Sequence, residues 1–160
     1  MPPSNQAPRL LPSILDRLID PESMGGLVAG YDPREMMDAV RADLEELLNT
    51  RQTTVDVPPE FEHVRSSIVT YGLPDLAGFN ATSPGQAAEL AQIIADVVAR
   101  NEPRLIRIKV TVARGGTATR AVKFHIEAAL NMDPAPEVGF ETILELASGR
   151  ATVSPDGGTA

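Results

Sequence analysis

The chain has 160 residues, a formal net charge of −8 at pH 7, 42% hydrophobic residues and no cysteine. This length fits one domain with one hydrophobic core. The acidic balance argues against nucleic acid as a partner, because binding along phosphates needs clustered Lys and Arg. The lack of cysteine excludes disulfides and thiolate metal sites, and it suits a reducing cytoplasm. No apolar run reaches the roughly 18 residues of a membrane-spanning helix, so direct membrane insertion is not expected.

Both ends of the chain are polar and carry proline or glycine. The first residues include Pro2 and Pro3, and the last include Gly157 and Gly158. Such segments bury too little apolar surface to order themselves. We therefore expect disordered tails over residues 1–9 and 154–160, and a single domain over 10–153. The N-terminus shows no secretion-signal pattern.

Two amphipathic helices are expected in the first third of the chain. The first is short, is capped by Ser13, and ends where Asp20 precedes a proline. The second begins with Asp32 as N-cap, Pro33 at its first position and Glu35 in a capping-box relation. Its apolar face comprises Met36, Met37, Val40, Leu44, Leu47 and Leu48. The acidic residues off this face, Asp43, Glu45 and Glu46, are interpreted as a solvated surface.

Two further helices are expected before the pattern changes. A short one, with apolar residues from Phe61 to Tyr71, ends at Gly72, where a left-handed C-terminal cap costs little. A longer one opens at Ser83-Pro84 and runs to about Arg100. Its buried side comprises Leu90, Ile93, Ile94, Val97 and Val98.

The hydrophobic period then shortens from near 3.6 to 2, which is typical of strands. Apolar and polar residues alternate over 106–112 and again over 122–128, with a turn at 114–117 between them. A third strand is expected over 138–147 and a short last one over 151–153. The order of elements predicts an α+β fold, with N-terminal helices packed on one face of a small C-terminal, mainly antiparallel sheet of three to four strands.

Side chains that carry chemistry are sparse. His63 and His125 lie in different elements, and neither has a second ligand at metal-binding spacing. No serine lies in a nucleophile motif. Glu22 and Asp32 are the one pair that would suit a cell-wall muramidase, although Asp32 already serves as an N-cap. We predict no catalytic residue, no cofactor and no metal, and a protein that is not an enzyme.

The tripeptide Glu102-Pro103-Arg104 stands where the last helix gives way to the first strand. One reading is an exposed ion pair worth about 0–1 kcal/mol. The other is a bidentate contact of Arg104, within the fold or across an interface, where desolvation strengthens it.

Four segments, in this order, resemble one family. They are Ser13 to Leu18, Asp43 to Arg51, Ser66 to Leu76, and Glu102-Pro103-Arg104. Together they are similar to the TssE proteins of type VI secretion systems and to the baseplate wedge proteins of contractile phage tails. The resemblance runs from about Leu11 to Val153.

The resemblance implies a structural subunit of a baseplate wedge, with TssF, TssG and TssK as partners, which starts polymerisation of the contractile sheath. Sheath proteins TssB and TssC would add strands to its sheet, since an unpaired strand edge is a template for another strand. It also implies a cytoplasmic location, in a baseplate docked at the inner membrane. The alternatives are the muramidase and the equivalent baseplate protein of a phage tail or extracellular injection particle.

The family's Glu-Pro-Arg motif falls on Glu102, Pro103 and Arg104, with wedge contact or fold integrity as its implied role. The other matched segments contribute further expected contacts. The residues expected to bind partners are Glu102, Pro103, Arg104, Asn49, Arg51, Tyr71, Pro74 and Asp75.

Overall fold

A computed structural model gives the structure of the chain. It describes residues 13–19, 31–53, 57–58, 60–76, 79, 83–113 and 121–156. Contacts between Cα atoms divide the chain into two compact units, residues 1–40 and 41–160, which are described separately. The tail expected over 1–9 and the turn expected at 114–117 lie outside the described residues. The single domain over 10–153 stays a prediction.

The first unit contains α1 (Ile14–Ile19) and the start of α2 (Pro33–Asn49). Asp32 caps α2 as expected: its Oδ1 accepts from the backbone N–H of Arg34 at 2.8 Å and of Glu35 at 2.9 Å. The Glu35 carboxylate in turn accepts from the Asp32 backbone N–H at 2.8 Å. This reciprocal pattern is a capping box, which satisfies donors that the helix leaves unpaired.

The apolar face of α2 is buried nearly as the period predicts. Met37 is half-buried. The fully buried residues of this face are Met36, Val40, Leu44, Leu47 and Leu48.

The segment after α2 differs from the single short helix that was expected. It forms α3 (Glu62–Arg65) and a separate 3₁₀ turn, η2 (Ile68–Thr70). The Ser67 hydroxyl donates to the carbonyl of Val64 at 2.7 Å and accepts from the N–H of Val69 at 3.3 Å. Serine side chains that bond the nearby backbone compete with helix continuation, and this explains the break.

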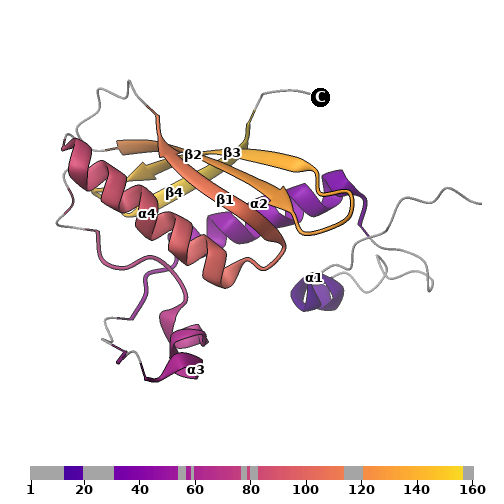
Figure 1. Ribbon diagram of the computed structural model, residues 1–160, viewed down its shortest axis with the longest axis horizontal. Coiled ribbons are helices and arrows are strands. Elements are labelled where there is room, and N and C mark those ends of the chain that lie inside the picture. Colours follow the sequence, from indigo (N-terminus) through magenta and orange to yellow (C-terminus); the bar gives the residue numbers. More distant parts are fainter. Residues whose placement is uncertain are drawn as a thin grey trace, which may run out of the picture. The chain divides into compact units, whose positions relative to one another are not determined.

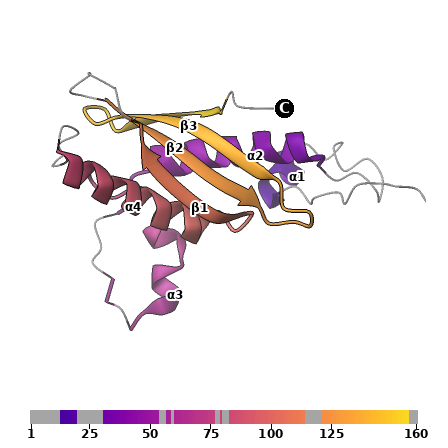
Figure 2. The same ribbon diagram turned by 45° about the horizontal axis from the view of Figure 1, so that its top comes forward.

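The second unit carries the sheet. After α4 (Pro84–Asn101) come β1 (Leu105–Val112), β2 (Ala121–Leu130), β3 (Glu137–Glu145) and β4 (Arg150–Pro155). The strands are antiparallel in the order β1-β2-β3-β4. In Figures 1 and 2, α4 and residues 41–49 of α2 lie on the same face of the sheet. The α+β prediction is confirmed, and β4 runs two residues beyond the expected end at Val153.

The core lies between this sheet face and the helices. Phe124, Ile126 and Phe140 are at most 1% exposed, as are Leu90 and Ile94 of α4. With few aromatic residues available, aliphatic side chains supply most of the packing. Each such side chain contributes about 1.5–3 kcal/mol when it is fully buried.

One irregularity breaks the alternation expected in β1. Ile106 pairs with Ala129 and Val110 pairs with Ile126, with a register shift between them. The four-residue step on β1 therefore meets a three-residue step on β2, which is a β-bulge. Arg107 has a φ of 55° at this point, an uncommon conformation for a residue with a side chain. The partners Ala129 and Ile126 are three residues apart and face opposite sides of the sheet, so the bulge places Ile106 and Val110 on opposite sides as well.

Gly72 has a conformation and a position that a larger residue would not tolerate. Its φ is +100°, and a Cβ atom there would lie 2.4 Å from the Thr50 carbonyl oxygen. That oxygen accepts from the Leu73 N–H at 2.8 Å, and the Leu73 carbonyl accepts from the Gln52 N–H at 2.8 Å. Gly72 thus permits the bridge that ties the end of α2 to the segment after η2.

Gly72→Ala is expected to lower the free energy of unfolding by about 2 kcal/mol or more, through backbone strain and the clash with Thr50. Gly85→Ala is the matched control, because a Cβ there meets nothing within 4 Å and the residue is helical. It should leave stability unchanged or raise it by up to about 1 kcal/mol. Urea unfolding of both variants measures this, and equal stabilities would refute it.

Candidate functional site

Arg104 lies between two carboxylates from different parts of the chain. Its Nε donates to Glu102 Oε1 at 2.7 Å, and its Nη2 contacts both Glu102 Oε2 and Asp43 Oδ2. Glu102 ends α4, Arg104 precedes β1, and Asp43 lies on α2. We call Asp43, Glu102 and Arg104 the Arg104 cluster. It ties α2 to the junction of α4 and β1.

The cluster is largely removed from solvent. Glu102 is 4% exposed, and the side chains of Arg104 and Asp43 are 24% and 34% exposed. Burial lowers the pKa of Arg104, but its hydrogen bonds and charge attraction with Glu102 and Asp43 outweigh this and raise the pKa above its usual value. Of the two interpretations of the tripeptide, the structure shows the second: Arg104 makes a bidentate contact with the Glu102 carboxylate within the fold. Arg104 Nη1 is buried and makes no hydrogen bond within the part of the chain that is described.

Tyr71 belongs to the same neighbourhood. Burial raises the pKa of its phenol, and the negative charges of Glu46, Asp43 and Glu102 raise it further. The structure therefore brings three of the predicted site residues, Tyr71, Glu102 and Arg104, close to one another. Pro103 lies between the last two, is exposed, and accepts a hydrogen bond on its carbonyl from Asn131 at 3.2 Å.

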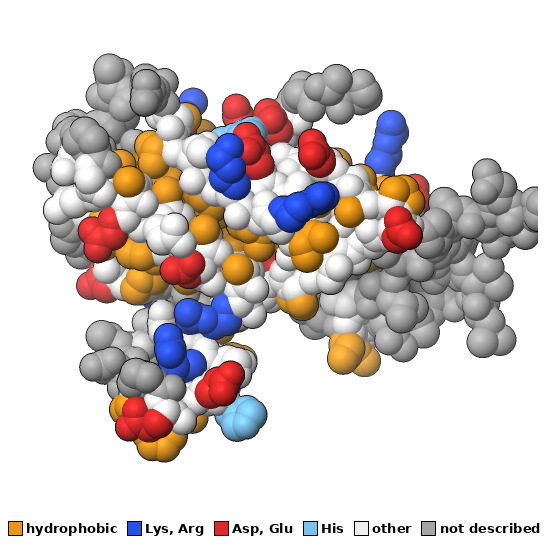
Figure 3. Space-filling view, in the orientation of Figure 1, with side chains coloured by type: hydrophobic (Ala, Val, Ile, Leu, Met, Phe, Trp, Pro, Cys, Tyr) orange, Lys and Arg blue, Asp and Glu red, His pale blue; other side chains and the backbone are white. Residues whose placement is uncertain are grey.

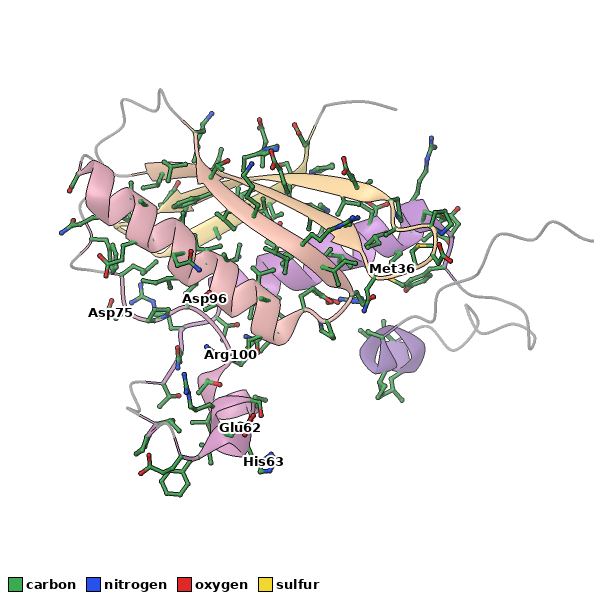
Figure 4. The ribbon with its side chains drawn as sticks, in the orientation of Figure 1. Met36, Glu62, His63, Asp75, Asp96 and Arg100 are labelled. Carbon is green, nitrogen blue, oxygen red and sulfur yellow. The ribbon has the colours of Figure 1, made fainter. Side chains whose placement is uncertain are left out.

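A second group gathers at the end of α2. Arg51, Pro74 and Asp75 line a pocket of about 160 Å³, together with Thr50, Leu73 and Gly149 among others. Asp75 is labelled in Figure 4, on the segment between η2 and α4. The Arg51 guanidinium donates to the Ser148 carbonyl at 3.3 Å. A Cβ at Gly149 would lie 2.7 Å from Arg51 Nη2, so glycine allows this close approach.

Asn49 serves another purpose. Its Nδ2 donates to the carbonyls of Glu45 at 2.7 Å and Ala151 at 2.9 Å, and its Oδ1 accepts from the Ala151 N–H at 2.9 Å. Its amide thus pairs with the backbone at the outer edge of β4. Whether any of the eight predicted residues binds a partner stays a prediction.

Sequence reasoning missed the role of Asp43. The residue was assigned to a solvated surface because it lies off the apolar face of α2, yet it pairs with Arg104, 61 residues away in the chain. Helical period separates buried from exposed positions, but it carries no information on pairing over such a distance. The signal available was the place of Asp43 at the head of a matched segment.

The other candidates for chemistry are placed separately wherever the structure describes them. His125 lies 3.4 Å from Asp156 and 3.8 Å from Glu127, and His63 is on α3 (Figure 4). Within the described residues, no three side chains of the kinds that hold metals come together. The Asp32 carboxylate accepts the N-terminal hydrogen bonds of α2, and Glu22 lies outside the described residues. No helix there has the length and apolarity to cross a membrane.

Charges of both signs are interspersed on the face of the molecule seen in Figure 3, with no broad field of one sign. An exposed ion pair of Lys109 with Glu127, 3.1 Å apart, lies between β1 and β2. The arrangement suits contacts with proteins better than a continuous phosphate track.

The fold is an α+β fold in which a buried charge cluster joins two helices to an antiparallel sheet. The family described as "Baseplate wedge protein gp25" matches residues 34–135 of the chain. The chain therefore belongs to the baseplate wedge protein gp25 family, which is a structural baseplate component.

Among solved structures, a chain of "The baseplate complex from the type VI secretion system" is similar, with 21% identity, a TM-score of 0.46, and coverage of 70% of this chain and 96% of that chain. No curated protein sequence matches.

Replacing Arg104 by alanine would leave Glu102 as an unpaired carboxylate in a buried place. We expect Arg104→Ala to lower the free energy of unfolding by about 3 kcal/mol or more. Lys109→Ala, which removes an exposed pair with Glu127, should cost no more than about 1 kcal/mol. Urea unfolding measures the free energy of unfolding of the two variants. Equal decreases would show that the buried ion pair of Arg104 stabilises the fold no more than the exposed pair of Lys109 does.

Proposed function

We propose that the chain is a structural subunit of the baseplate wedge of a type VI secretion machine. It joins TssF, TssG and TssK in the wedge, and it starts sheath polymerisation by offering sheet edges to TssB and TssC. The single observation that carries the proposal is membership of the baseplate wedge family over residues 34–135.

The geometry supports a scaffold. The Arg104 cluster and the bonds of Asn49 to β4 hold the C-terminal half of α2 against the sheet at two places. A subunit that presents the same sheet edges to successive partners benefits from such rigid positioning, because less conformational entropy is lost on binding. The four-stranded antiparallel sheet provides two edge strands, and an edge strand is a template for strand addition.

The eight predicted residues are assigned to partner contacts under this proposal. The Arg104 cluster with Pro103 and Tyr71 forms one contact region. Asn49, together with the pocket of Arg51, Pro74 and Asp75, forms another. The protein is not an enzyme, and it is cytoplasmic, in a baseplate docked at the inner membrane. Its charged groups act by orienting partners and excluding wrong ones.

Affinity capture of the tagged chain from its own cells, followed by mass spectrometry, tests the proposal. We expect TssF, TssG and TssK to be recovered together with TssB and TssC. Turnover of purified peptidoglycan, assayed on the same preparation, should be absent.

Two controls make the result decisive. An untagged strain removes proteins that bind the matrix, and Glu22→Gln tests the muramidase alternative, because it removes the one candidate acid. Hydrolysis that disappears with Glu22→Gln, without baseplate partners, would overturn the proposal. Recovery of tail proteins of a phage or extracellular particle would assign the chain to that machine instead.

A further inference from the structure

The α3–η2 segment, residues 60–70, is held together by hydrogen bonds of its own. The Thr70 hydroxyl donates to the Arg65 carbonyl at 2.7 Å, and the Ser66 hydroxyl donates to the Glu62 carbonyl at 3.1 Å. Helix α3 has no buried residue, and Thr70 is the buried residue of η2. Local polar bonds therefore fix the segment, while its apolar side chains have no core of their own.

Four large apolar side chains of this segment lie at the surface. Phe61 is 54% exposed, Val64 39%, Ile68 87% and Val69 38%. Among the described residues of the second unit, one other large apolar side chain is exposed, that of Ile143 on β3, at 39%. A single exposed apolar residue is ordinary, but a group of them so close in the chain marks a surface that another protein covers.

The charges beside these side chains indicate which protein fits. Glu62, labelled in Figure 4, and Arg65 are both exposed and lie three residues apart in α3, on the same side of the helix. Neither forms an ion pair within the described residues. One acid and one base side by side favour neither a uniformly acidic nor a uniformly basic partner, because each would repel one of the two.

A second copy of the chain satisfies both charges at once. In a twofold symmetric interface the same patch meets itself, so that residue i contacts residue j and j contacts i. Two α3–η2 segments with their α3 helices antiparallel bring Glu62 of each copy to Arg65 of the other. The apolar side chains of Phe61, Val64 and Ile68 then meet beside these pairs. The patch is thus complementary to itself in both charge and polarity.

We infer that the free chain forms a weak twofold dimer through the α3–η2 segment. Burial of Phe61, Val64 and Ile68 drives association, and reciprocal pairs of Glu62 with Arg65 set its register. Four side chains cover less than the roughly 800 Å² per partner of a stable interface, and the net charge of −8 on each copy opposes association. We expect a dissociation constant of about 10–100 µM.

Sedimentation equilibrium of the purified full chain at about 5–500 µM measures the association. Wild type should pass from monomer to dimer over this range. Ile68→Ser should weaken the dimer by about tenfold or more, because the side chain loses its burial in both copies. Ile143→Ser is the matched control, since it removes the exposed isoleucine of β3 outside the segment, and it should leave the association unchanged.

An exchange of charges tests the twofold pairing itself. Glu62→Arg and Arg65→Glu should each weaken the dimer by about threefold to tenfold, since each brings like charges together. An equal mixture of the two variants should regain the wild-type association, because the introduced arginine of one variant then faces the introduced glutamate of the other. All of the substituted positions are exposed, so the circular dichroism and urea unfolding of the variants should match those of wild type.

Three results would contradict the dimer. A wild-type chain that stays monomeric at all these concentrations would overturn it outright. A dimer that Ile68→Ser leaves unchanged, or that Ile143→Ser weakens equally, would place the interface elsewhere. A mixture of the charge variants that associates no better than either alone would refute the reciprocal pairing. Dimerisation is a property of the chain alone, so these outcomes are independent of the proposed baseplate role.

Discussion

The ion cluster of Arg104 with Glu102 and Asp43 is the contact on which the second unit of this chain depends. Three elements meet there, because Glu102 ends α4, Arg104 leads into β1 and Asp43 lies on α2. A buried carboxylate is costly unless it is paired, so the guanidinium determines how closely these elements approach. The same helix continues to Asn49, which bonds the far edge of the sheet at β4. Helix α2 is thereby attached to the second unit at two places, near the start of β1 through Arg104 and at β4 through Asn49.

The same arrangement protects one edge of the sheet. With α2 held by Arg104, the side chains of Asn49, Arg41 and Glu45 reach the backbone of β4. These bonds occupy backbone groups that an unprotected edge strand would offer to another strand.

The sequence predicts the elements well and the contacts poorly. The capping box at Asp32, the apolar face of α2 and the alternation of β2 all follow from local rules. The break between α3 and η2 escaped those rules because the hydroxyl of Ser67 competes with the helical backbone. The bulge at Arg107 escaped them because alternating residue types continue through it. The pairing of Asp43 with Arg104 depends on tertiary structure alone, and only the motif Glu102-Pro103-Arg104 directed attention to that region.

A double-mutant cycle between Asp43 and Arg104 tests the central claim most directly. The free energies of unfolding of Asp43→Ala, Arg104→Ala and the double variant are compared with that of the wild-type chain in urea. If the cluster joins α2 to the α4–β1 junction, the two substitutions are coupled by about 1 kcal/mol or more, because each removes the same contact. Effects that add to within about 0.5 kcal/mol would contradict the account, since Arg104 would then act through Glu102 alone.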